Sequence, residues 1–204
     1  MILYLDDLLK ADNLGHAVSL IANNFREKYQ FPDIYQLGVV VPDVEAAAVE
    51  LEAKGIGPFF IASNTLNFWS EHGEPKMFHG KVGIAYHKGF EIELLEPGVG
   101  STFYKSCVDS ECRMVVQHLG FRVKDVDAYT KRLEKNGCAT WVRGRIKSFP
   151  LVTDFAYMDT RDQAGIILEF IDMKIMGFAI KVSAGVFHTI GRVQKIIGVR
   201  SFSF

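Results

Sequence analysis

The sequence predicts an α+β fold in which two tandem βαβββ modules form a curved mixed sheet around a central cleft. The main observation is an internal repeat, because QLGVVVPDVEAAAVELEAKG at 36–55 returns as HLGFRVKDVDAYTKRLEKNG at 118–137. Each copy then continues to an apolar strand, around Glu93 in the first and around Glu169 in the second. One such unit leaves the open face of its sheet uncovered, so two units are expected to pair and share a site where they join.

The composition is that of a globular protein without a nucleic-acid surface. Of the 204 residues 49% are hydrophobic, the formal net charge is −1, and Lys and Arg form no long stripe. Three cysteines without zinc-binding spacing favour a reducing compartment. The opening MILYLDDLLKADN is too acidic for a signal peptide, and no apolar run is long enough for a bilayer. We expect a cytoplasmic protein that binds neither nucleic acid nor membrane.

The elements of the first half follow in order. Apolar residues at three- and four-residue spacing predict a helical extension over 1–32, which ends at a proline. The first module, 33–98, begins with a buried strand at 34–41. A helix follows at 42–55, with Asp43 as its N-cap and Gly55 as its stop. Apolar stretches at 58–63, 66–69, 81–87 and 90–96 predict further strands, separated by Gly, Pro and polar turns.

The second module, 114–172, repeats this order. A strand at 115–123 precedes a helix at 125–137, and strands are expected around ATWVRGRI, DFAYMDT and GIILEFI. The apolar extension 173–204 contains scattered Lys and Arg. Its stretch 182–197 is compatible with an amphipathic helix that packs on the outside of the sheet or on a second subunit.

Four potential metal ligands stand at matching places in the two copies: Gln36, Glu93, His118 and Glu169. Because a strand presents alternate side chains to one face, the two members of each copy can point the same way, and pairing of the modules brings the sets together. One amide oxygen, one imidazole and two carboxylates suit octahedral Ni, Co, Fe, Mn or Zn. Alternatively, the amide and imidazole are ordinary polar groups near strand starts and the glutamates face solvent.

The chain resembles the vicinal oxygen chelate superfamily, which contains glyoxalase I, methylmalonyl-CoA epimerase, extradiol dioxygenases and bleomycin-resistance proteins. The resemblance covers about 33–172 and is strongest in the glyoxalase-like branch, through GIGPFF (55–60), IELLEP (92–97), VVQHLGFRVKDVD (115–127) and FAYMDT (155–160). In this family the first and last strands of each module carry the metal ligands. The resemblance therefore implies the same four ligands that the repeat indicates, Gln36, Glu93, His118 and Glu169.

The resemblance implies a metal-dependent isomerase or lyase that abstracts a proton next to a carbonyl through a metal-stabilised enediolate. Glu169 and Glu93 are the implied bases, the substrate a carbonyl compound or an acyl thioester, and a homodimer is expected. Dioxygenase chemistry would need a second histidine, which the strand DFAYMDT lacks. The alternative is a metal-independent small-molecule binding protein of the resistance type on the same fold.

Four further residues are candidates for substrate binding. Arg145 and Lys147 lie in VRGRIKSFP, where glyoxalases carry a mobile basic loop, although a run of charges is usually a solvated loop. Phe60 and Trp69 are candidates for the wall of an apolar pocket, although aromatic residues on strands more often belong to the core.

Overall fold

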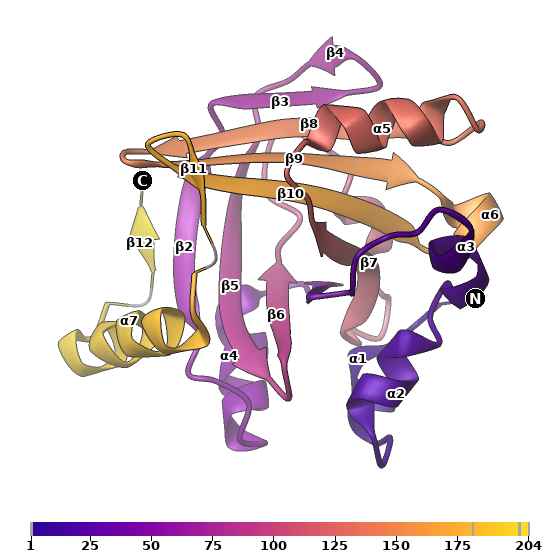
Figure 1. Cartoon of the computed structure of the whole chain (residues 1–204). Helices are drawn as coiled ribbons and strands as arrows, with labels where there is room; N and C mark the ends of the chain where they lie inside the picture. The colour runs from indigo at the N-terminus through magenta and orange to yellow at the C-terminus, as the bar shows by residue number, and fades with distance from the viewer. Residues whose placement is uncertain (1, 181, 200, 204) are drawn as a thin grey trace.

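A strongly curved mixed sheet dominates the computed structural model of the chain (Figure 1), as the predicted fold class requires. The structure describes residues 2–180, 182–199 and 201–203; residues 1, 181, 200 and 204, which belong to the two predicted extensions, lie outside it. The strands are β1 (Gln36–Val40), β2 (Phe60–Thr65), β3 (Phe68–Glu71), β4 (Glu74–Pro75), β5 (His79–His87), β6 (Phe90–Leu95), β7 (Val115–Arg122), β8 (Ala139–Ser148), β9 (Leu151–Asp159), β10 (Ile167–Ile175), β11 (Phe178–Ala179) and β12 (Phe202–Ser203).

The order of these strands follows the repeat. Each copy forms a four-stranded unit, β2-β5-β6-β1 in the first and β7-β10-β9-β8 in the second, and β1 pairs antiparallel with β7 where the units join. Within each unit the first strand is parallel to the last, β1 to β6 and β7 to β10. The duplicated βαβββ arrangement predicted from the repeat is therefore present.

A hairpin that only the first copy carries connects the two ends of the sheet. Its strands β3 and β4 pair with each other, and β3 also pairs antiparallel with β8 of the second copy. Only Leu66 and Asn67 separate β3 from β2, which lies in the other unit beside β5. The chain therefore crosses from one unit to the other at this point.

The two repeat helices, α4 (Val44–Ala53) and α5 (Val126–Glu134), begin as predicted. The Asp43 side chain accepts a hydrogen bond from the Ala46 N–H at 2.9 Å, and Asp125 accepts one from the Ala128 N–H at 3.0 Å. Both helices bury their apolar residues against the same side of the sheet. We call this side the outer face, and the opposite side the inner face.

The predicted N-terminal helical extension consists of three short helices, α1 (Leu5–Leu9), α2 (Leu14–Ser19) and α3 (Asn23–Lys28). Asn13 caps the second by accepting a hydrogen bond from the His16 N–H. Leu5, Val18 and Phe25 are buried and join the same hydrophobic core as the repeat helices.

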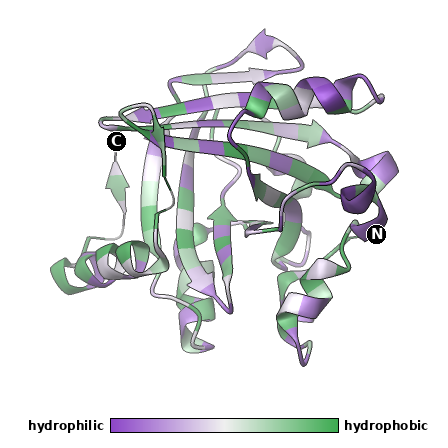
Figure 2. Ribbon diagram, viewed as in Figure 1, coloured by the Kyte–Doolittle hydropathy of each residue, from purple (hydrophilic) through white to green (hydrophobic). Residues whose placement is uncertain are grey.

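The C-terminal helix α7 (Ala184–Ile197) packs across the edge of the sheet along β2 and β5. Its Lys195 contacts Glu52 of α4 on the outer face, whereas its Phe187 lies against Tyr86 on the inner face, so it does not pack on the outside of the sheet alone. Figure 2 shows that it is largely hydrophobic. The Gln194 amide is buried, accepts from the Ile61 N–H at 2.9 Å and donates to the Ile61 carbonyl at 2.7 Å. The Gln194 side chain thus pairs with both the N–H and the carbonyl of Ile61 on strand β2.

Two remaining helical elements are short: α6 (Arg161–Ala164) before β10, and the 3₁₀ turn η1 (Lys105–Cys107) in the linker between the modules. Across the described parts of the chain, no helix is both long and apolar enough to cross a membrane.

An aromatic cluster fills the inner face of the second module. The linker between the modules supplies Phe103 and Tyr104, and the hairpin supplies Trp69. Phe103 lies 4.9 Å from Tyr157 of β9 between ring centroids. All four side chains are buried, so this part of the inner face is packed core rather than open surface.

Candidate metal centre

The repeat places Gln36 and His118 at the join between the modules. In the antiparallel pair of β1 and β7, Gln36 stands opposite Gly120, and Gly38 stands opposite His118. Each copy thus presents one candidate ligand and, two residues later, one glycine. Because alternate residues of a strand share a face, both ligands point to the inner face.

Each glycine makes room for the ligand of the other copy. A Cβ atom at Gly38 would lie 1.7 Å from Cε1 of His118, and a Cβ atom at Gly120 would lie 2.3 Å from Oε1 of Gln36. Both distances are far below van der Waals contact, so only glycine allows the two side chains to lie flat across the join. The two ligands therefore cross over each other's strands.

The two glutamates flank this pair on the neighbouring strands. Glu93 of β6 is the register partner of Gly38, and Glu169 of β10 is the register partner of Gly120. The ligand-capable atoms of Glu93, His118 and Glu169 all lie within 4.8 Å of one another. The structure therefore brings together, from three strands, three of the four residues expected to hold a metal, with the fourth on the adjoining strand.

This group is buried and tightly spaced. Nε2 of His118 lies 3.1 Å from Oε2 of Glu169 and 3.6 Å from Oε2 of Glu93. The side chains of His118 and Glu169 are 0% and 4% exposed, whereas that of Glu93 is 16% exposed. Among these three, Glu93 is the side chain that a molecule arriving from solvent meets first.

The atoms that face one another in this group have no ordinary partners. Within the described part of the chain, Gln36 Oε1, Glu93 Oε2, His118 Nε2 and Glu169 Oε2 are buried and accept or donate no hydrogen bond. The other ring nitrogen of His118, Nδ1, lies 2.7 Å from Oε1 of Gln117. Since an amide oxygen only accepts, Nδ1 carries a proton, and Nε2 is the ring nitrogen that faces the glutamates.

Burial and charge shift the acidities around the group. Burial lowers the pKa of His118, but the carboxylates of Glu169 and Glu93 outweigh it and raise the pKa to about 9. Burial, together with repulsion from Glu169, raises the pKa of Glu93 above its ordinary value. Burial also raises the pKa of Tyr104 and Tyr157 well above the usual value, so both hydroxyl groups stay protonated.

Tyr157 and Tyr104 lie against the candidate centre. The Tyr157 ring meets the His118 ring edge to face, with 4.9 Å between centroids, and the two tyrosine hydroxyl groups are 2.9 Å apart. Both belong to the aromatic cluster of the inner face. The inner face of β9 presents Phe155 and Tyr157, so the described strand offers no second histidine of the kind a dioxygenase centre needs.

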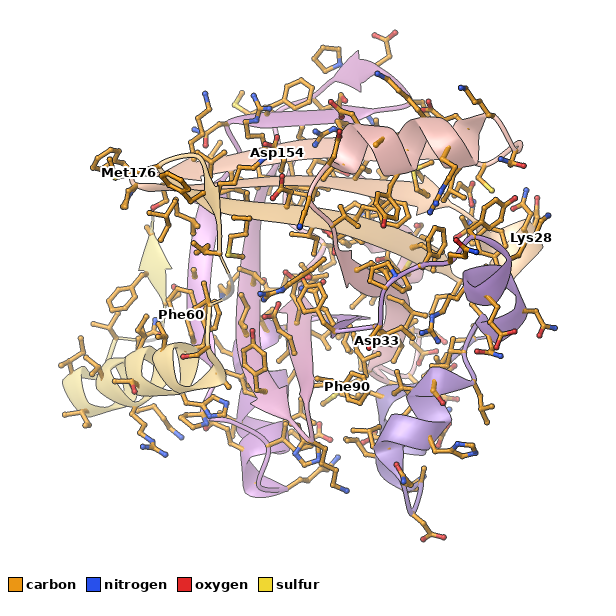
Figure 3. The ribbon with its side chains drawn as sticks, in the orientation of Figure 1. Lys28, Asp33, Phe60, Phe90, Asp154 and Met176 are labelled. Atoms are coloured by element: carbon orange, nitrogen blue, oxygen red, sulfur yellow. The ribbon has the colours of Figure 1, made fainter. Side chains whose placement is uncertain are left out.

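The two predicted aromatic contacts have different surroundings. Trp69 lies on the inner face but is 1% exposed, and its Nε1 donates to Glu71 at 2.8 Å. Phe60 lies at the margin beside α7 (Figure 3), where its ring is 5.8 Å from that of Phe187 and 6.4 Å from that of Phe202. Trp69 is thus part of the packed core, whereas Phe60 is half-buried at the rim of the sheet.

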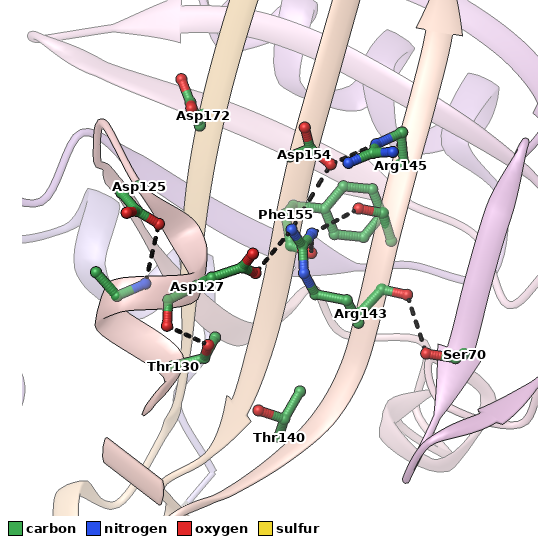
Figure 4. Close-up of polar contacts among 12 residues, drawn as sticks. Ser70, Asp125, Asp127, Thr130, Thr140, Arg143, Arg145, Asp154, Phe155 and Asp172 are labelled. Carbon is green, nitrogen blue, oxygen red and sulfur yellow. Dashed lines mark hydrogen bonds and ion pairs between the residues drawn. The ribbon is translucent and has the colours of Figure 1, made fainter. Parts of the chain in front are cut away.

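Arg145 and Lys147 are not brought to the centre. Gly144 faces the inner-face residue Phe155, so its neighbour Arg145 points to the outer face. There its Nε donates to Asp154 at 2.6 Å, on the side of the sheet that α5 covers (Figure 4). Lys147 shares this face by alternation and is exposed. We therefore leave both residues out of the proposed site.

Sequence reasoning missed two residues that contact candidate ligands: Gln117, which lies against Nδ1 of His118, and Glu91, which lies against Gln36. Glu91 is 4% exposed, and its Oε1 accepts a hydrogen bond from Nε2 of Gln36 at 2.8 Å. A usable signal was present, because Glu91 stands two residues before Glu93 and must share its face.

Comparisons with known proteins found one matching family and several similar solved structures. A family model described as the Glyoxalase/Bleomycin resistance protein/Dioxygenase superfamily matches residues 35–157. A hypothetical protein from Bacillus halodurans C-125 is 14% identical with a TM-score of 0.46, over 68% of this chain and 92% of that one. A comparison with curated proteins gave no significant match.

Two methylmalonyl-CoA epimerases are also similar. The one from Streptomyces coelicolor is 15% identical with a TM-score of 0.45, over 69% of this chain and 96% of its own. The one from Mycobacterium tuberculosis is 15% identical with a TM-score of 0.43, over 68% of this chain and 85% of its own. Because the family model spans more than half of the sequence, the chain belongs to the glyoxalase, bleomycin resistance protein and dioxygenase superfamily.

Proposed function

We propose that this protein is a metal-dependent isomerase or lyase of the glyoxalase and epimerase type, which removes a proton next to a carbonyl group. Four residues would hold the metal: Gln36, Glu93, His118 and Glu169. The observation that carries the proposal is the set of four buried, unpartnered oxygen and nitrogen atoms that these residues present. Buried polar atoms normally have a partner, so a cluster of orphaned ones fits a bound cation.

The donor set matches a divalent transition metal. Three oxygens and one imidazole nitrogen suit Ni, Co, Mn, Fe or Zn, and they leave positions for water or substrate. The Nδ1 contact of His118 with Gln117 is the kind of outer contact that orients an imidazole ligand. When bound, such an ion acts as a Lewis acid that polarises the carbonyl oxygen of the substrate.

The protein's own contribution is proton transfer in a dry environment. Oε2 of Glu93 and Oε2 of Glu169 flank Nε2 of His118 on two sides, so each is a candidate to take a proton from the substrate carbon. Glu93 is the more accessible of the two. The aromatic cluster around Tyr157 excludes water from one side of the centre, which strengthens the electrostatic interactions there.

The proposed substrate is a small carbonyl compound or an acyl thioester that reaches the centre past Glu93. Phe60, at the rim, is a candidate for contact with it. The homodimer and the cytoplasmic location expected from the sequence stay predictions.

Metal analysis of the purified, untagged protein tests the proposal. We expect near-stoichiometric divalent metal in the wild type, and its loss in a His118→Ala, Glu169→Ala double variant that keeps its circular dichroism spectrum. The chemistry has a separate test. Glu169→Gln should keep the fold but abolish solvent deuterium uptake into carbonyl or thioester substrates, and undiminished uptake would refute the role of Glu169.

A metal-independent binding protein is the second candidate. The 3.1 Å contact between His118 Nε2 and Glu169 Oε2 favours it, because an imidazolium and a carboxylate at this distance can neutralise each other without an ion. In that case the glutamates would accept hydrogen bonds from a ligand. No metal in the wild type, even after reloading with Ni, Co, Mn and Zn, would decide for this alternative.

A further inference from the structure

Glu91 and Gln36 form a buried pair next to the candidate metal centre. They are register partners in the parallel pair of β1 and β6. Gln36 is 2% exposed and Glu91 4%. Nε2 of Gln36 donates to Oε1 of Glu91 at 2.8 Å. Glu91 is not one of the three grouped ligand residues, so its contact with Gln36 needs a separate explanation.

The contact determines which end of the Gln36 amide faces which neighbour. A side-chain amide has one oxygen that accepts and one NH2 group that donates. Oε1 of Glu91 accepts from Gln36 and its Oε2 accepts from the Tyr86 hydroxyl, so the NH2 group is the end of the amide that faces Glu91. The oxygen then lies over Gly120, whose register partner on the other side is Glu169. Only the oxygen can bind a cation, so this orientation is the productive one.

Glu91 is itself held in place by two further side chains, Tyr86 and Arg122. The Tyr86 hydroxyl donates to its Oε2, and Nη2 of Arg122 lies 3.8 Å from the same oxygen. Tyr86 in turn packs against the C-terminal helix. Its N–H donates to Nε2 of His188 at 3.0 Å, and its ring stacks on that of Phe187. The chain of contacts runs from α7 through Tyr86 and Glu91 to Gln36.

The second copy supports this assignment by contrast. On β10 the residue two places before Glu169 is Ile167, and it is the register partner of His118, just as Glu91 is that of Gln36. His118 receives its orienting contact from Gln117 instead. An imidazole needs one acceptor for its single N–H, whereas an amide needs an acceptor that forces its NH2 group away from the metal. The carboxylate therefore occurs only where the ligand is an amide.

We propose that Glu91, held by Tyr86, is a positioning residue that turns Oε1 of Gln36 toward Glu93, His118 and Glu169. This inference rests on the proposed metal centre. The C-terminal helix α7, which contacts Tyr86, would then help to position Gln36, although the metal centre itself lies in the repeated modules.

Metal affinity of three variants tests it, with Co²⁺ titrated against a competing chelator. Glu91→Leu removes the acceptor at similar volume, and we expect an affinity about 10- to 100-fold weaker, as for other outer contacts of metal ligands. Glu91→Gln still offers an oxygen to Gln36 and should stay close to the wild type. Tyr86→Phe should show a smaller loss than Glu91→Leu. Ile167→Val, at the matching position of the second copy, is the control and should leave the affinity unchanged.

A second measurement uses the metal-free protein. The side-chain NH2 resonances of Gln36, observed by ¹⁵N NMR, should be shifted and protected from exchange in the wild type and in Glu91→Gln. They should become averaged and exchange freely in Glu91→Leu, or in Tyr86→Phe if the leucine variant does not fold.

The outcomes separate the two proposals. A wild type that binds no Co²⁺ overturns the metal centre and this inference with it. A wild type that binds Co²⁺, with Glu91→Leu of equal affinity and unchanged Gln36 resonances, overturns the positioning role alone.

Discussion

The imidazole of His118 lies directly over the α-carbon of Gly38 on the neighbouring strand, where a Cβ atom would come within 2.0 Å of Nε2. The repeat makes the reciprocal contact as well, since Gln36 lies over Gly120 in the same way. The two candidate ligands and the two glycines therefore form one interlocked unit across the join of the modules.

This contact predicts that Gly38→Ala disrupts the centre. The added methyl group must push the ring of His118 aside, so we expect a stability loss of about 1–3 kcal/mol. Metal binding should weaken as well, because Nε2 moves away from the glutamates. Urea unfolding and Co²⁺ titration measure the two effects.

Gly185→Ala is the matched control for this glycine substitution. Its Cβ atom would lie 3.9 Å from the nearest side-chain atom and sits in a helix, so stability should stay equal or rise by roughly 0.5–1 kcal/mol. Wild-type metal affinity in Gly38→Ala would show that His118 does not need its observed position.

The Gln194 contact predicts a large effect from a residue far from the candidate centre. Gln194→Ala leaves both the N–H and the carbonyl of Ile61 without their partner, at a cost of roughly 1–3 kcal/mol for each unsatisfied group. The loss should appear in urea unfolding. Thr189→Ala, at an exposed position of the same helix, should change the free energy of unfolding by less than about 0.5 kcal/mol. Equal stability of the two variants would contradict the edge-capping role of Gln194.

Glu71 predicts a pH-dependent contribution to stability. Burial raises the pKa of this carboxyl, but hydrogen bonds from Lys76, Ser101 and Trp69 outweigh it and hold the pKa below the ordinary value of 4.5. A carboxylate whose pKa is depressed by folding stabilises the protein above its unfolded pKa, and this contribution is lost as the pH falls through the folded value. The stability gained from Glu71 should therefore be complete at pH 7 and decline below about pH 4.5.

Urea unfolding of Glu71→Gln at pH 7 and at pH 3.5 checks this expectation. The variant should be less stable than the wild type at pH 7, and the difference should shrink at the lower pH. Glu74→Gln, on the exposed strand β4 of the same hairpin, serves as control. It should be as stable as the wild type at both pH values. A difference for Glu71→Gln that is constant across this range would contradict the predicted titration.

Arg145 provides a negative prediction. It lies on the outer face and pairs with Asp154, so Arg145→Gln should leave metal affinity and any deuterium exchange unchanged. A surface ion pair contributes about 0–1 kcal/mol, which bounds the expected loss of stability. Glu93→Gln, on the inner face, should by contrast abolish the exchange. Reduced exchange in Arg145→Gln at saturating metal would show that the basic strand β8 does reach the substrate.

Most of the fold could be predicted because it depends on local patterns that occur twice. The Asp43 and Asp125 caps are short-range signals, and the observed helices begin one residue after each. The candidate ligands could be predicted as well, since period two assigns the strand face and the repeat matches Gln36 to His118. Glu91 was predictable by the same rule, although only the structure shows that it contacts Gln36.

The sequence alone thus determined the repeat, the order of the elements and the residues proposed as metal ligands. Tertiary structure decided the rest, because it depends on contacts between distant segments. The pairing of β3 with β8 and the insertion of Phe103 from the linker leave no local pattern. The face of Arg145 depends on a bulge in β8 between Thr140 and Val142, which reverses the alternation of all later side chains. A bulge is a feature of the pairing between two strands, not of one strand alone. The basic residues of β8 could therefore be assigned to a face of the sheet only once its pairing with β9 was known.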